Sequence, residues 1–299
     1  MKKALLQLHF AVFIWGFTGV LGRAITLDSV WLVWYRLLIT VLSIWALYFV
    51  LKKIRKISLS SALAISSIGV ILVLHWLFFY GSIKYANVTI ALTCLSTTAL
   101  ISSLLEPLIL RKKFDPFEIV LGLFAVAGII IIYNTHIGFS IGIIIGLVSA
   151  VLSVLTSILN KKIIDDYDAE QITLYQLTGG FVGLSILLPF YHHFFPAQTS
   201  VPSTWDWGWL IVLSWVCTII TFFLYLRSLK KVSAFTLNLV LTLEPVYGIG
   251  LAFVFYDEDK LLGQWFYLGF ALIILAVMLH TWRLVKHSFK QTTAISTPQ

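Results

Sequence analysis

The chain has 299 residues, of which 60% are hydrophobic and only 11% are charged, and its mean hydropathy is +0.96. Soluble domains carry about 25% charged residues, so this composition excludes a water-soluble globular protein and predicts a chain embedded in a lipid bilayer. The net charge of +8 does not indicate nucleic-acid binding, because the basic residues stand in short clusters between apolar runs, as in the loops of membrane proteins.

Long apolar segments follow one another along the whole chain, with short connections between them. A membrane-spanning helix needs about 20 mostly apolar residues. Ten segments meet this requirement: 4–22, 30–51, 62–83, 88–110, 118–134, 139–160, 170–190, 207–226, 233–255 and 262–284. We therefore predict an all-α integral membrane protein with ten transmembrane helices, followed by a polar, disordered cytoplasmic tail over residues 287–299.

The basic residues divide unequally between the two sides of this predicted bundle. With ten spans, 17 Lys and Arg residues fall on the side of the N-terminus and 3 on the opposite side, while Arg36 lies within a span. Cytoplasmic loops of membrane proteins carry the excess of Lys and Arg. The asymmetry predicts a multi-pass protein of the plasma (cytoplasmic) membrane with both termini in the cytoplasm.

The two halves of the chain, 1–137 and 138–286, show weak similarity to each other. The clearest match aligns Ile83-Lys84 and the run 86–92 with Leu229-Lys230 and the run 232–238. The next sets Leu121-Gly122-Leu123 against Leu268-Gly269-Phe270. Five spans is an odd number, so the second half enters the membrane from the opposite side, which predicts two inverted five-helix repeats. Secondary transporters with such repeats bind substrate near the membrane midplane, where the repeats meet.

Helices 1 and 2 carry two polar or aromatic residues of interest. Trp15 stands beside Gly16, and a small residue next to a large ring permits close helix approach, so Trp15 is a candidate cavity residue. Arg36 lies about two turns inside the second span. Two interpretations of Arg36 are open. In the first it is structural, either in an ion pair or with its side chain snorkelling toward the interface. In the second it pairs with Glu244 or with a carboxylate of the substrate.

Helix 3 contains a group of candidate cavity residues past its middle. His75 titrates near neutral pH as a free side chain, so it is a candidate for proton coupling, although a buried histidine can equally be structural. Trp76 and Tyr80 share one helix face and offer rings that would stack on an aromatic or cationic substrate. Packing in an apolar core remains the alternative for both.

Helix 4 contains Glu106 directly before Pro107, five residues from Arg111. Placing a charge in the bilayer centre costs about 2.5–3.5 kcal/mol on insertion scales, and such residues usually face the protein interior. Glu106 is therefore a candidate gate or proton site. The alternative is a salt bridge to Lys or Arg at the cytoplasmic interface.

Helix 9 contains Glu244, which we regard as the strongest candidate for a functional residue. It precedes Pro245, and a proline frees the carbonyl four residues earlier, while Asn238 and Thr242 lie one turn apart on the same helix. We expect Glu244, Asn238 and Thr242 to face a substrate cavity, with Glu244 accepting protons or binding a cation. The alternative is a protonated, hydrogen-bonded structural glutamate.

Several short motifs occur in a fixed order along the chain. They are Phe13-Ile14-Trp15-Gly16, Tyr35-Arg36, Ile83-Lys84-Tyr85-Ala86, Leu243-Glu244-Pro245, Asp257-Glu258 and Leu268-Gly269. Through them the sequence resembles the EamA-type transporters of the drug/metabolite transporter superfamily across nearly its full length. The resemblance implies two inverted five-helix repeats, peripheral helices 5 and 10, and a central cavity lined mainly by helices 1, 3, 4, 6, 8 and 9.

The first half departs from that family pattern at three places. Ala99 stands where proline is frequent, Lys112 stands where the acidic counterpart of Glu258 is expected, and Glu106-Pro107 comes seven residues later than the position equivalent to Pro245. These departures suggest that the mechanics of the first half differ from those of other members.

The function predicted from these features is secondary transport, most simply export, of small metabolites such as amino acids by alternating access, with proton coupling as an option. Efflux of drugs or organic cations and substrate exchange are alternatives on the same fold, and passive conduction, lipid scrambling and an intramembrane enzyme are other classes. Because HExxH, Walker and CxxC motifs are absent, we expect no catalytic residue, metal or cofactor. The expected partners are a small-molecule substrate and the lipid bilayer, without nucleic acid, and the oligomeric state is left open.

Overall fold

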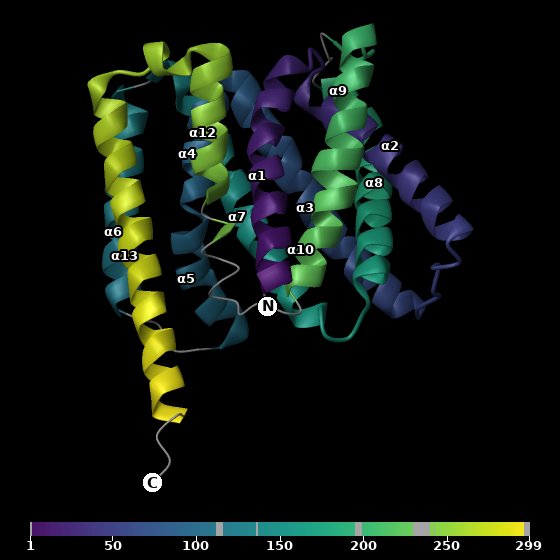
Figure 1. The fold of residues 1–299 in the computed structure, drawn as a ribbon. Helices are drawn as coiled ribbons and strands as arrows, with labels where there is room; N and C mark the ends of the chain where they lie inside the picture. The colour runs from purple at the N-terminus through teal and green to yellow at the C-terminus, as the bar shows by residue number, and fades with distance from the viewer. Residues whose placement is uncertain are drawn as a thin grey trace.

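The structure is a computed structural model, and it describes residues 2–111, 116–135, 137–194, 199–229, 240–241 and 243–295. Every regular element in these ranges is helical. The helices stand side by side in one bundle, with α6 and α13 together at one edge and α2 at the other (Figure 1). The predicted all-α architecture is therefore confirmed for the described part of the chain.

The helices of the first half follow the predicted segments closely, apart from a break in the fourth. They are α1 (Lys2–Ala24), α2 (Ser29–Val50), α3 (Leu59–Tyr85), α4 (Val88–Ser96), α5 (Thr98–Leu110) and α6 (Pro116–Thr135). The segment 88–110 forms two helices, α4 and α5, that meet at Thr97 and are bent by 46° relative to each other. The bend lies two residues before Ala99, and it forms without the proline that is frequent there in the family.

The second half contains one further irregularity, a π-helical turn inside its third span. The elements are η1 (Ile137–Phe139), α7 (Ser140–Ile163), α8 (Ala169–Phe194), α9 (Thr204–Ser214), the π-helical turn η2 (Trp215–Ile220), α10 (Thr221–Leu229), α12 (Leu243–Tyr256), η3 (Glu258–Leu261) and α13 (Gln264–Ile295). The last helix continues to Ile295, so residues 287–295 of the tail for which we expected disorder are helical, and residues 296–299 lie outside the described ranges.

Six helical segments of the described chain are long and apolar enough to cross a membrane, or seven if the bent α4–α5 pair counts as one span. Three shorter apolar stretches, 119–134, 243–256 and 264–279, lie within α6, α12 and α13. The fold is thus a multi-pass helical bundle, whereas the total of ten transmembrane helices stays a prediction.

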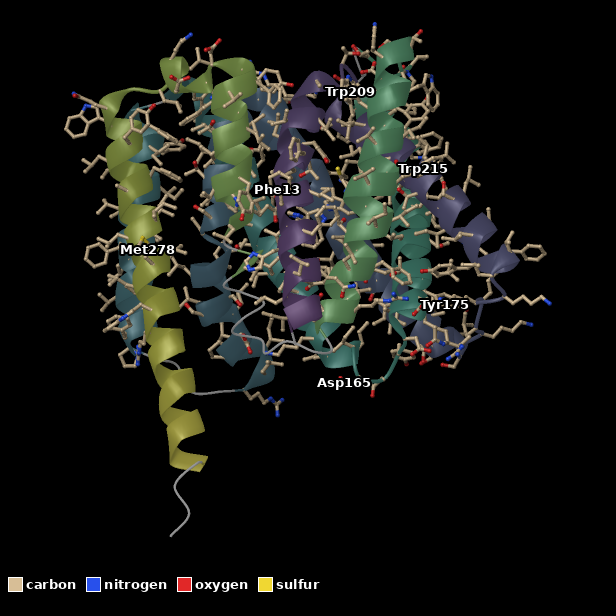
Figure 2. All side chains as sticks on the ribbon, in the orientation of Figure 1. Phe13, Asp165, Tyr175, Trp209, Trp215 and Met278 are labelled. Carbon is tan, nitrogen blue, oxygen red and sulfur yellow. The ribbon has the colours of Figure 1, made fainter. Side chains whose placement is uncertain are left out.

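The outer surface of the bundle is rich in exposed apolar side chains. Leu6, Phe49, Val254 and Met278 each leave more than three fifths of their surface exposed. Side chains project outward from the helices at the edges of the bundle (Figure 2). Soluble monomers rarely expose large apolar patches to water. These faces are suited to contact with lipid chains.

Small residues set the closest helix contacts. A Cβ added at Gly69 of α3 would lie 1.8 Å from the carbonyl oxygen of Gln176 on α8. At the edge of the bundle, a Cβ on Gly128 of α6 would lie 2.5 Å from the carbonyl oxygen of Gly269 on α13. The α6–α13 pair corresponds to the fifth and tenth predicted spans, and its place at the edge agrees with the peripheral position that we expected for them (Figure 1).

Candidate functional site

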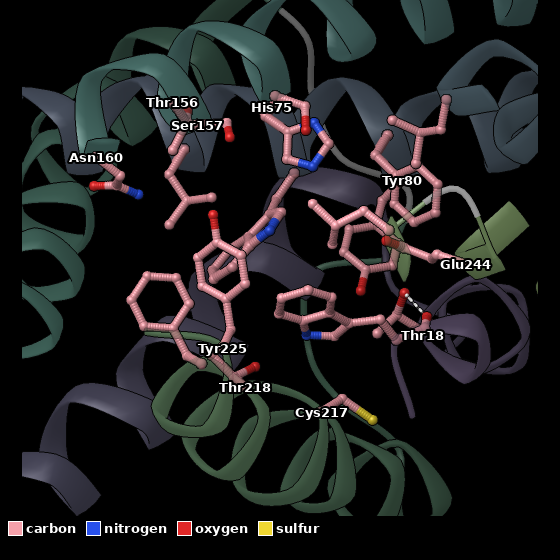
Figure 3. Close-up of a pocket in the computed structure, with 18 of the residues that line it drawn as sticks. Thr18, His75, Tyr80, Thr156, Ser157, Asn160, Cys217, Thr218, Tyr225 and Glu244 are labelled. Carbon is pink, nitrogen blue, oxygen red and sulfur yellow. Dashed lines mark hydrogen bonds between the residues drawn. The ribbon is translucent and has the colours of Figure 1, made fainter. Parts of the chain in front are cut away.

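A cavity of about 870 Å³, including its open mouth, lies inside the bundle. Its walls come from both halves of the chain and include α1, α2, α3, α4, α7, η2, α10 and α12 (Figure 3). The lining residues are Trp15, Thr18, Arg36, Leu72, His75, Trp76, Phe79, Tyr80, Leu95, Ser153, Thr156, Ser157, Asn160, Cys217, Thr218, Phe222, Tyr225, Leu241 and Glu244.

Most of the expected cavity residues meet in this one space. Trp15, His75, Trp76, Tyr80 and Glu244 all line it. The helices that line it are the expected ones, the first, third, fourth, sixth, eighth and ninth spans, with the second span added. The predicted residues Asn238 and Thr242 lie outside the described residues.

Arg36 is the residue that the second span contributes. Its side chain is buried, with 3% of its surface exposed. Nε donates a hydrogen bond to the Thr218 hydroxyl at 2.9 Å, and one terminal nitrogen donates to the Tyr80 hydroxyl at 2.9 Å. The guanidinium carbon lies 3.8 Å from the centre of the Trp76 ring, which places the cation over an aromatic face that attracts it.

The π-helical turn η2 and the residue before it contact both the side chain and the backbone of Arg36. Within this turn the Thr218 hydroxyl donates to the Leu213 carbonyl at 2.8 Å, and just before it the Ser214 hydroxyl donates to the Arg36 carbonyl at 3.0 Å. Single π-helical turns are rare and frequently occur at functional sites. Here the turn brings the Thr218 hydroxyl within hydrogen-bond distance of the Arg36 guanidinium.

The sixth span contributes a polar stripe that the sequence analysis missed. Ser153, Thr156, Ser157 and Asn160 follow the i, i+3, i+4, i+7 spacing of one helix face, and all four line the cavity. Asn160 is 2% exposed, and its side-chain oxygen has no hydrogen-bond partner among the described residues. This spacing within an otherwise apolar helix was the available signal.

His75 is bound on one side of its ring and lines the cavity with the rest. Nδ1 lies 3.0 Å from the Ser149 carbonyl oxygen and 2.8 Å from the Ser149 hydroxyl, which itself donates to the His75 carbonyl at 3.0 Å. A carbonyl oxygen only accepts, so Nδ1 carries the hydrogen and Nε2 of the neutral ring is an acceptor. Within the described residues no hydrogen bond reaches Nε2.

The rings at the α1 side of the cavity are held by α10. The Trp15 indole N–H donates to the Thr221 hydroxyl at 2.8 Å, and the Trp15 and Tyr225 ring centres lie 5.5 Å apart. Thr18 donates its hydroxyl hydrogen to the Trp15 carbonyl at 2.7 Å. These contacts fix the orientation of Trp15 in the absence of substrate.

The two candidate carboxylates lie in different surroundings. Glu244 is in the first turn of α12 and lines the cavity, near Thr18 in the close-up (Figure 3). Glu106 of α5 does not line it, and its carboxylate pairs with the Lys161 ammonium of α7 at 3.1 Å. The geometry of Glu106 is that of the salt bridge considered as its alternative, while Glu244 keeps the position expected of a site residue.

The membrane-compatible bundle, the two-part construction and the polar cavity between the halves define a polytopic membrane protein of the transporter class. The sequence profile of the EamA-like transporter family matches residues 2–134 and again 140–282. The chain therefore belongs to the EamA-like transporter family, and it consists of two copies of that family's repeat.

Comparison with solved structures supports the fold. One matching structure, titled "Crystal structure of protein", covers 96% of this chain and 99% of its own length with a TM-score of 0.63, at 14% sequence identity. At this identity the likeness concerns the fold alone. A search of curated proteins finds no match.

Proposed function

We propose that this protein is a secondary transporter that exports small metabolites, such as amino acids, across the plasma membrane by alternating access. The observation that supports this best is a cavity whose walls come from both repeats and contain Arg36 and Glu244. In inverted-repeat transporters the substrate site lies where the repeats meet. The excess of basic residues on the side of the termini supports a cytoplasmic location for both.

In this proposal Glu244 couples transport to protons. An ionised carboxylate that leaves water needs a partner, and within the described residues neither a hydrogen bond nor an ion pair reaches Glu244. Binding and release of a proton would therefore change the charge of the cavity as it opens to either side. The energy source is then a proton gradient, because the sequence has no Walker-type nucleotide motif.

Efflux of organic cations is the second candidate function. It is favoured by the combination of the Glu244 carboxylate with the rings of Trp15 and Tyr225 in one cavity, since aromatic faces and carboxylates both attract cations. The buried cation Arg36 in the same cavity disfavours it.

The experiment is substrate flux into proteoliposomes with and without an imposed pH gradient, on the wild type and on Glu244→Gln. We expect the gradient to accelerate wild-type flux and to have no effect on Glu244→Gln, because the variant has no proton to exchange. Counterflow exchange of substrate should persist in the variant. Asp165→Asn is the matched control, since Asp165 is exposed in the loop between α7 and α8, and it should respond as the wild type does. Equal stimulation of both proteins by the gradient would refute the role of Glu244.

A further inference from the structure

Arg36 is a buried cation for which the described residues provide no counter-ion. Three groups contact it, the Thr218 hydroxyl, the Tyr80 hydroxyl and the Trp76 ring, and all three are neutral. Of the ion pairs in the described chain, none involves Arg36. Buried charges in proteins are normally paired, so the absence of a carboxylate beside this arginine requires an explanation.

The contacts leave donors available on the cavity side. A guanidinium has five N–H donors in a planar fork, and the bonds to Thr218 and Tyr80 use two of them. The same two bonds and the Trp76 ring, 3.8 Å from the guanidinium carbon, hold the fork in place. The hydroxyls of Thr40 and Ser214 both donate to the backbone carbonyl of Arg36, at 2.7 and 3.0 Å, and so fix the main chain at this position. The charge is thus oriented before any ligand arrives.

We propose that Arg36 binds the carboxylate of the transported substrate, and that the substrate is a small carboxylate with an apolar or aromatic body. The proposal rests on the transport function proposed above and narrows its substrate class. A carboxylate fits the planar fork with two parallel hydrogen bonds. The body of the substrate then packs against the remaining wall, which includes the rings of Trp15, Phe222 and Tyr225.

The charge balance of the cavity favours one negative charge on this group over two. Among the described residues that line the cavity, Arg36 is the single Lys or Arg, and Glu244 lines the same space. A phosphate dianion would bring two negative charges to a cavity with one cation, Arg36, and one carboxylate, Glu244. A substrate carboxylate brings one negative charge, which the single positive charge of Arg36 balances. An additional amino group on the substrate would be compatible with Glu244.

The test measures binding of three probes that share one body to the purified full-length protein. The probes are 3-phenylpropionate, its neutral amide 3-phenylpropanamide, and 3-phenylpropylamine. We expect the acid to bind at least about tenfold more tightly than the amide, as a hydrogen-bonded charge pair provides. Equal affinity of acid and amide, no measurable binding of the acid, or equally tight binding of inorganic phosphate would each overturn the proposal.

Variants separate this role from a merely structural one. Arg36→Gln should abolish the preference for acid over amide, and Arg36→Lys should retain part of it because the charge remains without the planar fork. Arg55→Gln is the control, because Arg55 is exposed and pairs with Asp168 away from the cavity. If Arg36→Gln does not fold, the affinities of the wild type for acid and amide still test the proposal. Tyr80→Phe then serves as the second variant: it removes one hydroxyl that positions the guanidinium and should reduce the preference for acid over amide.

The outcomes for transport and for Arg36 are distinguishable. Flux of the amine or amide that is unaffected by Arg36→Gln would leave the transport function standing and overturn the carboxylate site. Arg36-dependent binding of the acid without flux of any probe in proteoliposomes would support the carboxylate site and overturn the transport function.

Discussion

Glu258 shows how this chain stabilises a charge that it buries completely. Its side chain is 0% exposed, and its carboxylate pairs with the Arg23 guanidinium. It also accepts hydrogen bonds from the backbone N–H groups of Val88 and Thr89, at 3.1 and 2.7 Å, and from the Thr89 hydroxyl at 2.6 Å. A carboxylate at the N-terminus of α4 is favourable because the first N–H groups of a helix have no helical partner. Glu258 thus joins α1, α4 and η3.

We predict that Glu258→Gln lowers the stability of the folded protein by about 2–3 kcal/mol. Removing one partner of a buried ion pair leaves the other uncompensated, and the loss is reduced because Arg23 is about one third exposed. The measurement is the thermal unfolding of the purified protein in detergent. The adjacent Asp257→Asn is the control: Asp257 is mostly exposed, pairs with Lys260 on the surface and has a positive φ of 50° that asparagine tolerates. A variant at 258 as stable as the one at 257 would contradict this account.

The contrast between Glu258 and Arg36 marks the limit of what the sequence could predict about the site. Intramembrane polar residues stand out by type, so His75, Trp76 and Glu244 were identified as candidates and the structure places them in the cavity. The sequence does not show which charges meet. The partner of Glu258 lies 235 positions away. Of the neutral groups around Arg36, Thr218 belongs to the π-helical turn at 215–220, whereas Tyr80 and Trp76 belong to α3. Their functional roles stay predictions.

At the scale of the elements, the contact between α3 and α8 depends on glycine. Gly69 of α3 faces the backbone of Gln176, and on α8 a Cβ added at Gly179 would lie 2.2 Å from Cβ of Ser66. Small residues let helix backbones approach closely in a membrane, where packing replaces the hydrophobic driving force. This interface forms one wall of the bundle behind the cavity residues of α3.

We predict that Gly69→Ala separates these two helices and destabilises the fold, although alanine is the better helix former. The added methyl group would lie 1.8 Å from a carbonyl oxygen, and overpacking of this kind costs about 1–3 kcal/mol or more. Gly122→Ala on α6 is the matched control, because a Cβ there meets nothing within 4 Å and the gain in helix propensity is about 1 kcal/mol. Opposite shifts of the melting temperature are expected. A Gly69 variant that melts with or above the control would refute the close-contact explanation.

The helix positions were largely predictable, whereas their irregularities were not. Apolar length located the segments that became α1, α2, α3, α7 and α8, because the bilayer sets that length. The helix break at Thr97 contains no proline or glycine that would predict it. The Thr97 hydroxyl and backbone N–H both donate to the Cys94 carbonyl. The sequence therefore gives no signal for this bend.

At the scale of the whole molecule, the orientation in the membrane is a prediction that two features support independently. The beginning of α1 and the end of α13 lie at the same end of the bundle (Figure 1), where Asp165 also lies (Figure 2). The basic residues are concentrated on the side that the ten-span prediction assigns to the termini. An even number of crossings requires both termini to share one side.

Labelling of single introduced cysteines tests this orientation. The two variants are Lys56→Cys and Val201→Cys. Position 56 lies between α2 and α3, position 201 lies between α8 and α9, and both are exposed. The native Cys94 and Cys217 are 1% and 2% exposed, so they should react little and need not be replaced. We expect a membrane-impermeant maleimide to label Val201→Cys on intact cells, and Lys56→Cys only after the membrane is permeabilised, because the loop at 52–56 carries four basic residues. The reverse pattern would place the termini outside, and labelling of both on intact cells would exclude the predicted arrangement of spans between them.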